Sequence, residues 1–257
     1  MKRLSIAFIL LISLSFAQES VVISPQSIVV NPKPSFSAEV WVDKDPSGNA
    51  TPSYNIGENI RIGVKVSEDA YIYLFSIHAN GVIDQILPNR YDNAGKSNYL
   101  KANRSKYFPH NDAPYTFSVD GPEGLDKVFV VASKKPLNTN QLANFETDPN
   151  FASSNIGQQG FAETLSIIVK PKEQSSWVTD TALFNVGRAN TSRYGTIKID
   201  SSPSGAAAYV DGQFVGYTPV RYGTTTGGHT VTVRFSARSF VTTVDLSSGE
   251  TEQVNAR

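Results

Sequence analysis

The sequence predicts a mainly β protein: a β-rich α+β N-terminal domain with an antiparallel sheet and a short helix, followed by a smaller β domain. Its 257 residues include 18 glycines, 14 prolines, 11 tyrosines and 14 phenylalanines, which suit turns and half-buried strands. Several segments alternate apolar and polar residues, as strands with one buried face do. The length fits one large or two modest domains.

The composition excludes several classes of protein. Lys plus Arg and Asp plus Glu both number 23, so the chain is formally neutral and is no polycationic nucleic-acid binder. It has no cysteine, which excludes disulfides, cysteine nucleophiles, thiolate metal sites and lipoprotein acylation. With three histidines and one methionine, a histidine-rich metal centre is not expected, and no cofactor is predicted.

The first 17 residues have the features of a cleavable signal peptide. Lys2 and Arg3 precede an apolar run over residues 4–16, and the small residues Ser15 and Ala17 suit a cleavage site after Ala17. The run is shorter than the about 20 residues of a membrane-spanning helix. We therefore expect an exported mature chain without a transmembrane span, located in the periplasm, the cell envelope or at the cell surface. The alternative is an uncleaved N-terminal anchor.

The next elements are an extended arm, a strand and a hairpin. Residues 18–37 contain three prolines and predict an extended linker or edge strand. Residues 60–66 place isoleucine and valine at alternate positions, which predicts a half-buried strand. Residues 71–78 are apolar on both faces, and the turn at residues 79–81 contains Asn-Gly before a second apolar run at 82–87. This pattern predicts a β-hairpin.

A long polar loop and further strands follow. The polar residues 88–114 predict a loop, and strands are expected at 115–119, 127–132 and 177–186. A short helix is expected over residues 140–145, with Thr139 as its cap. Another strand is expected where Leu165, Ile167 and Val169 alternate with Thr164, Ser166 and Ile168. The first domain then covers residues 38–186, and residues 187–194 form a linker.

Motifs in the first domain resemble the DUF4384 family over about residues 38–171. They are the Ser-Tyr-Asn-Ile-Gly-Glu stretch at 53–58, the run at 71–75, Gly81 with Gln-Ile-Leu-Pro-Asn at 85–89, and Val-Val-Ala-Ser at 130–133 with Pro-Leu at 136–137. Such domains recur in bacterial envelope and signalling proteins without an established activity. The resemblance therefore implies a location and a fold more than a chemistry.

The C-terminal segment, residues 195–257, resembles a PEGA domain over about residues 195–254. The turn that gives this family its name is Pro203-Ser204-Gly205-Ala206 here, with Ser204 where the family has Glu. Asp211-Gly212 suits a tight hairpin, and residues 230–235 and 240–246 alternate as strands do. The resemblance implies a small C-terminal β-sandwich.

The catalytic and metal motifs that we sought are missing or incomplete. The chain contains no G-x-S-x-G, P-loop or H-E-x-x-H motif, and His78, His110 and His229 lie on three different predicted elements. We therefore expect no enzyme. Asp43, Asp45 and Ser47, with glycine next, match the start of a calcium loop, but its twelfth position is Tyr54 rather than glutamate. A polar hairpin turn is the favoured interpretation of that segment.

The polar loop also mixes aromatic and basic side chains, which suits glycans, acidic wall polymers or the rim of a protein partner. The predicted partner-binding residues are Arg90, Tyr91, Lys96, Tyr99, Lys101, Arg104 and Tyr107. The alternative is that these rings pack the loop onto the sheet while the charges remain solvated.

These observations predict an exported, non-enzymatic cell-envelope protein. It would be a binding or structural module associated with the surface layer, the cell wall or envelope protein partners. The alternative is a secreted hydrolase or a small-ligand sensor that uses the 88–114 loop as a lid. That alternative predicts a concave pocket with convergent polar groups beneath the loop.

Overall fold

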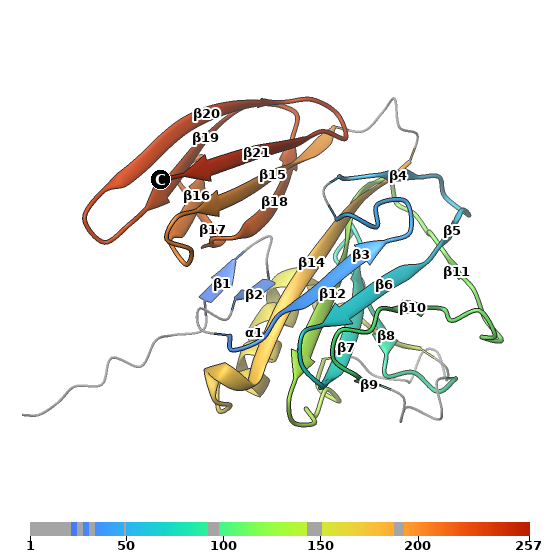
Figure 1. The fold of residues 1–257 in the computed structure, drawn as a ribbon. Helices are drawn as coiled ribbons and strands as arrows, with labels where there is room; N and C mark the ends of the chain where they lie inside the picture. The colour runs from blue at the N-terminus through green and yellow to red at the C-terminus, as the bar shows by residue number, and fades with distance from the viewer. Residues whose placement is uncertain are drawn as a thin grey trace, which may run out of the picture.

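The computed structural model describes residues 22–24, 28–30, 34–48, 50–91, 98–142, 151–187 and 193–257. The predicted signal peptide, residues 1–17, lies outside this part of the chain. Figure 1 shows a larger β-rich part that contains the helix and a smaller part made of the C-terminal strands. The fold class predicted from the sequence, mainly β, is confirmed.

The larger part contains most of the elements. In chain order they are β1 (Val22–Ser24), β2 (Ile28–Val30), β3 (Ala38–Val42), β4 (Ser53–Tyr54), β5 (Asn59–Ile60), β6 (Ile62–Val66), β7 (Ala70–Ile77), β8 (Ile83–Leu87), β9 (Tyr99–Leu100), β10 (Lys106–Phe108), β11 (Phe117–Ser118), β12 (Gly124–Ser133), β13 (Ala152–Ser154), α1 (Gly157–Val169), the 3-10 helix η2 (Gln174–Ser176) and β14 (Trp177–Val186). Strands β1 and β2 pair with each other in the segment expected as a linker or edge strand.

A central sheet runs in the order β13-β8-β7-β12-β14-β4, with β9 paired to β7. Its neighbours are antiparallel except for β4, which lies parallel to β14. The predicted hairpin is present as β7 and β8, and its turn is closed by a hydrogen bond from His78 N to Val82 O of 2.9 Å. Gly81 adopts a φ of +85° in this turn, a conformation that glycine tolerates without strain.

The central sheet is buried on both faces. Alternate residues of β7 and β12, such as Leu74 and Val130, pack with the second sheet β10-β6-β3. The intervening residues, such as Phe75 and Phe129, pack with the apolar side of α1. This arrangement of sheet, sheet and helix explains why residues 71–78 are apolar on both faces.

The strand expected through Leu165, Ile167 and Val169 is wrong, because these residues belong to α1. The residues that α1 buries are Phe161, Ala162, Leu165 and Val169, whose spacing is that of a helix face. Ile167, which strand alternation would have buried, is 67% exposed. The helix expected over residues 140–145 lies partly outside the described residues, and residues 141–142 form a turn.

The C-terminal part is a sandwich of two sheets. Its strands are β15 (Tyr194–Ser201), β16 (Ala207–Val210), β17 (Gln213–Tyr217), β18 (Val220–Thr225), β19 (Gly227–Arg234), β20 (Ser239–Leu246) and β21 (Thr251–Ala256). One sheet has the order β18-β15-β21 and the other β17-β16-β19-β20, with a shared apolar core between them. Asp211 and Gly212 both have positive φ, as the tight hairpin requires.

The two parts meet along β14 and β18. The guanidinium of Arg221 on β18 lies against Gly48, where an added Cβ would be 2.9 Å from Nη1 of Arg221. Arg221 also lines a hollow of about 380 Å³ together with Glu39, Asp180 and Lys198. The Thr51 and Thr196 hydroxyls form a hydrogen bond across the same contact.

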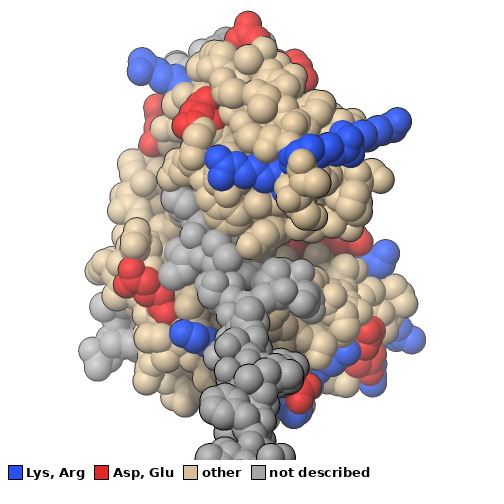
Figure 2. Space-filling model, turned by 90° about the vertical axis from the view of Figure 1, so that its left-hand side faces the viewer, with Lys and Arg blue, Asp and Glu red and all other residues tan. Residues whose placement is uncertain are grey.

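Charged side chains of both signs are distributed over the face shown in Figure 2. A row of Lys and Arg side chains crosses its upper part, which is the C-terminal part of the chain in Figure 1. None of the helices in the described ranges is long and apolar enough to cross a membrane.

Candidate functional site

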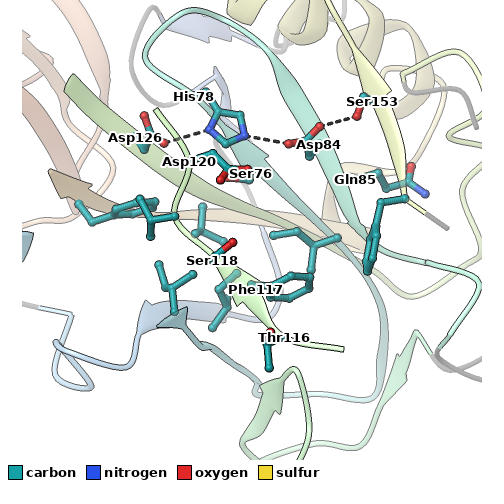
Figure 3. Close-up of a pocket in the computed structure, with 17 residues that line it drawn as sticks. Ser76, His78, Asp84, Gln85, Thr116, Phe117, Ser118, Asp120, Asp126 and Ser153 are labelled. Atoms are coloured by element: carbon teal, nitrogen blue, oxygen red, sulfur yellow. Dashed lines mark hydrogen bonds and ion pairs between the residues drawn. The ribbon is translucent and has the colours of Figure 1, made fainter. Parts of the chain in front are cut away.

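A pocket with both polar and apolar walls lies between the central sheet and the short pair formed by β5 and β11. Its volume is about 300 Å³. His78, Asp84 and Asp126 lie together at one end of it (Figure 3), and its apolar lining residues include Ile60, Phe117 and Phe184. We call this pocket the first hollow.

His78 is held between two carboxylates in the first hollow. Its Nδ1 lies 3.1 Å from Oδ2 of Asp126, and its Nε2 lies 2.8 Å from Oδ2 of Asp84. Asp126 also accepts a hydrogen bond from the backbone N–H of Ala79 at 2.7 Å, and Asp84 accepts one from the Ser153 hydroxyl at 2.5 Å. Figure 3 shows this chain of contacts from Asp126 to Ser153.

The two carboxylates fix the charge of the histidine. Hydrogen bonds to Asp126 and then to Asp84 raise the pKa of His78 to about 10, although burial acts in the opposite direction. Burial raises the pKa of Asp84, but the hydrogen bonds from His78 and Ser153 outweigh it and hold that pKa below its usual value. At neutral pH the group is therefore an imidazolium between two carboxylates.

This arrangement is poorly suited to base catalysis. A general base needs a ring nitrogen with a free lone pair and a pKa near the working pH. Both nitrogens of His78 donate to carboxylates, and its pKa is too high for proton transfer at neutral pH. The geometry is that of a structural ion cluster which gives the hollow fixed charges.

A second hollow of about 400 Å³ adjoins the first and shares Ile60, Thr116 and Phe117 with it. Its polar groups include Arg61 and Asn111. The guanidinium of Arg61 donates to Oδ1 of Asn111 at 2.8 Å and to the carbonyl of Pro109 at 3.3 Å. The second hollow thus offers both donors and acceptors.

Four aromatic rings form a cluster beside the two hollows, which we call the ring cluster. Its members are Tyr91, Tyr115, Phe117 and Phe151. Tyr115 lies 5.1 Å from Tyr91, 5.2 Å from Phe117 and 5.3 Å from Phe151, measured between ring centroids. Phe117 and Phe151 line the first hollow, and Tyr115 and Phe117 line the second. Tyr91 remains 40% exposed.

The predicted partner-binding residues that the structure describes lie on several elements. Tyr91 joins the ring cluster, with the exposed Arg90 next to it in the chain. Tyr99 and Lys101 lie at the edge strand β9, where both contact Asp69. Lys96 lies outside the described residues.

The remaining two partner-binding candidates are Arg104 and Tyr107. Arg104 is exposed and follows β9 in the chain. Tyr107 is on β10, where its hydroxyl accepts a hydrogen bond from Nε1 of Trp41 at 3.1 Å and its ring meets the Trp41 ring edge to face. The described candidates thus lie on different elements, and their role in partner binding stays a prediction.

The carboxylates of the calcium-like segment are engaged in the turn itself. Oδ1 of Asp43 accepts hydrogen bonds from the Tyr54 hydroxyl at 2.7 Å and from the backbone N–H of Arg61 at 3.1 Å. Asp45 accepts from the Ser47 hydroxyl at 2.6 Å and from the backbone N–H of Ala50 at 2.8 Å. Tyr54, at the twelfth position, thus closes the turn.

The loop expected as a lid has a limited part in these hollows. None of its described residues lines the first hollow, whereas Pro109, His110, Asn111 and Ala113 line the second. Sequence reasoning missed the Asp84–His78–Asp126 cluster and three of the four rings, because sheet pairing brings them together from distant positions. The only local signal was the pair of aromatic residues, Tyr115 and Phe117, on alternate positions.

The fold and site define a mainly β protein with a helix-backed sheet domain, a C-terminal β-sandwich and a mixed polar and aromatic site. Comparison with family models identifies its modules. Residues 53–136 match the family described as a domain of unknown function, DUF4384, and residues 194–257 match the PEGA domain. The chain therefore contains a DUF4384 domain followed by a PEGA domain, as their resemblances predicted, although the DUF4384 match is shorter than expected.

No curated protein matches this chain. Among solved structures, the Bacillus anthracis TIE protein is similar at 14% sequence identity with a TM-score of 0.23. The match covers 85% of this chain and 40% of that protein, so this chain spans less than half of its length.

Proposed function

We propose that this protein is an exported, non-enzymatic module of the bacterial cell envelope. Both of its β domains present surfaces that bind partner proteins or glycan of the surface layer or the cell wall. The N-terminal sequence supports export, because residues 1–17 have the charge, apolar run and small residues of a signal peptide.

The state of His78 carries the proposal of binding rather than catalysis. It is the histidine of the first hollow, and both of its ring nitrogens are bonded to carboxylates. Fixed charges and hydroxyls in a hollow with apolar walls serve to orient a bound group. The same arrangement is a poor source or acceptor of protons at neutral pH.

The PEGA domain supports a surface-associated role, since such domains are typically extracellular. It also carries cations stacked on aromatic rings, a combination common in binding surfaces. The guanidinium of Arg234 lies 4.3 Å from the Tyr209 ring, and that of Arg238 lies 5.0 Å from the Phe235 ring. The row of basic side chains in Figure 2 crosses this domain.

A small-ligand sensor is the second candidate. The first hollow favours it, because carboxylates, hydroxyls and apolar side chains converge on a volume of about 300 Å³. A hydrolase would need a base other than His78 in that hollow. A turnover that disappears on replacing His78 would overturn the non-enzymatic proposal.

Cross-linking in intact cells followed by mass spectrometry tests the proposed function. We expect the full chain to be captured with wall or surface-layer components. The chain without residues 1–17, retained in the cytoplasm, serves as the control and should not capture them. An exported chain that diffuses freely as a monomer with no retained partner would contradict the proposal.

A further inference from the structure

We propose that the ring cluster and the two hollows beside it form a binding site for a neutral oligosaccharide. The inference rests on the proposed binding function and names its partner as glycan. It depends on three features: packed rings, polar groups in both adjoining hollows, and a charge balance that disfavours anions.

The rings supply apolar surface that is held in place. Tyr91, Tyr115 and Phe151 lie 5.1 to 5.6 Å apart, and each ring is fixed by the others. They lie in the segments that flank three strands: Tyr91 follows β8, Tyr115 precedes β11 and Phe151 precedes β13. The C–H groups on one face of a pyranose pack against such rings without loss of side-chain freedom, because that freedom is already lost.

The hollows supply hydrogen-bonding groups within reach of the rings. Phe117 lines both hollows, so the two hollows adjoin at the ring cluster. The first hollow offers carboxylates and the hydroxyls of Ser118 and Ser153, and the second offers Asn59 and Asn111. A sugar has apolar ring faces and hydroxyls around its edge, and this distribution matches both kinds of surface.

The charges favour a neutral ligand over an acidic one. The first hollow is lined by Asp84, Asp120 and Asp126, and among its lining residues only His78 is cationic. Arg61 is the cation of the second hollow, and its guanidinium is already bonded to Pro109 and Asn111. A polyanion would meet unbalanced carboxylates, whereas sugar hydroxyls donate hydrogen bonds to them.

Titration calorimetry and backbone chemical-shift mapping on the full chain test this site. The probes are cellotriose and triacetylchitotriose, with trigalacturonate as the anionic comparison and trilysine as the cationic one. We expect at least one neutral trisaccharide to bind with a dissociation constant below about 1 mM. Its shifts should map to residues 59–61 and 115–120, and trigalacturonate should not bind.

Ring variants separate stacking from other effects. Tyr115→Ala should weaken binding about fivefold or more, whereas Tyr115→Phe keeps the ring and should retain it. Phe214→Ala is the matched control. Phe214 also packs with two other rings, but these belong to the C-terminal sandwich and not to the proposed site. If Tyr115→Ala unfolds the protein, Tyr91→Ala replaces it, since Tyr91 is 40% exposed.

Three results of these binding experiments would overturn the inference. Binding of trilysine without either trisaccharide would assign the site to a cationic peptide and overturn the inference. Binding of no probe, or equal binding by Tyr115→Ala and the parent chain, would also overturn it. Capture of envelope protein partners in the cross-linking experiment would still support the proposed function, so the two failures are distinguishable.

Discussion

At the scale of single residues, the positive charge on His78 stabilises the negative charges of Asp84 and Asp126, which both contact its ring. The Asp126 side chain is 2% exposed and the His78 side chain is 15% exposed. Replacing His78 by glutamine removes the cation that is hydrogen-bonded to the buried Asp126 carboxylate. We expect the free energy of unfolding to fall by about 3–5 kcal/mol, measured by urea denaturation at pH 7.

His229 provides the matched control for this prediction. It also bonds to an aspartate, with its Nδ1 2.7 Å from Oδ2 of Asp211, but the Asp211 side chain is 53% exposed. Because water solvates an exposed carboxylate, loss of the ion pair in His229→Gln should lower the free energy of unfolding by only about 1 kcal/mol or less. Equal losses for the two variants would contradict a special role for the His78 cluster.

Local sequence patterns pointed to only one residue of the ring cluster and to none of the Asp84–His78–Asp126 cluster. Tyr91 was singled out because it lies among basic residues in one stretch of sequence. Asp126 and Phe151 had no such local signal, because they reach the site through the pairing of β12 with β7 and of β13 with β8. Tyr107 was singled out by the same rule as Tyr91, yet it packs on Trp41.

At the scale of elements, the second sheet depends on a close approach between β3 and β6. Gly63 lies opposite Trp41 on one side and Tyr107 on the other. An added Cβ at Gly63 would lie 2.0 Å from the Trp41 ring. The indole lies over this glycine and donates its hydrogen bond to the Tyr107 hydroxyl.

Gly63→Ala should therefore displace Trp41 and destabilise the domain. We expect a loss of about 1–3 kcal/mol in the free energy of unfolding, with a change in tryptophan fluorescence. Gly228→Ala in β19 is the control, because nothing lies within 4 Å of its added Cβ. An unchanged unfolding midpoint for Gly63→Ala would show that β3 and β6 accommodate the methyl group.

The sequence predicted strands and hairpins better than the helix. The β7–β8 hairpin carries its own turn residues, and β14 has the bounds that were expected. For α1, the alternation at residues 165–169 predicts a strand, whereas the apolar pair Phe161 and Ala162 one turn earlier extends the pattern to a helix face. A five-residue window does not distinguish a period of 2 from one of 3.6 when both predict Leu165 and Val169 as buried.

At the scale of the whole molecule, charged groups from both parts line one hollow where β14 meets β18. Burial raises the pKa of Asp180 to about 6, against the opposing effects of Arg221 and of a hydrogen bond from Val40 N, and Glu39 raises it slightly. The folded state therefore binds a proton on Asp180 more tightly than the unfolded chain does. Its contribution to stability is complete below the ordinary pKa of 3.8 and is lost as the pH rises through about 6.

The variant Asp180→Asn isolates this dependence, since an amide keeps the shape and does not ionise. From pH 4 to pH 7 the parent chain should lose about 1–2 kcal/mol of unfolding free energy relative to the variant. Denaturant titrations of both chains at several pH values measure the difference. A constant or opposite difference would show that Arg221 keeps Asp180 ionised throughout.

The parallel pairing of β21 with β15 sets an order on how the C-terminal sandwich is completed. Strand β15 begins this domain and β21 is its last strand, yet each residue from Thr196 to Ser201 lies beside one from Thr251 to Ala256. During synthesis, the backbone N–H and C=O groups on that edge of β15 remain unpaired until about fifty further residues have been added and β21 can pair with them. Until then the nascent domain exposes an open strand edge that neighbouring chains could join.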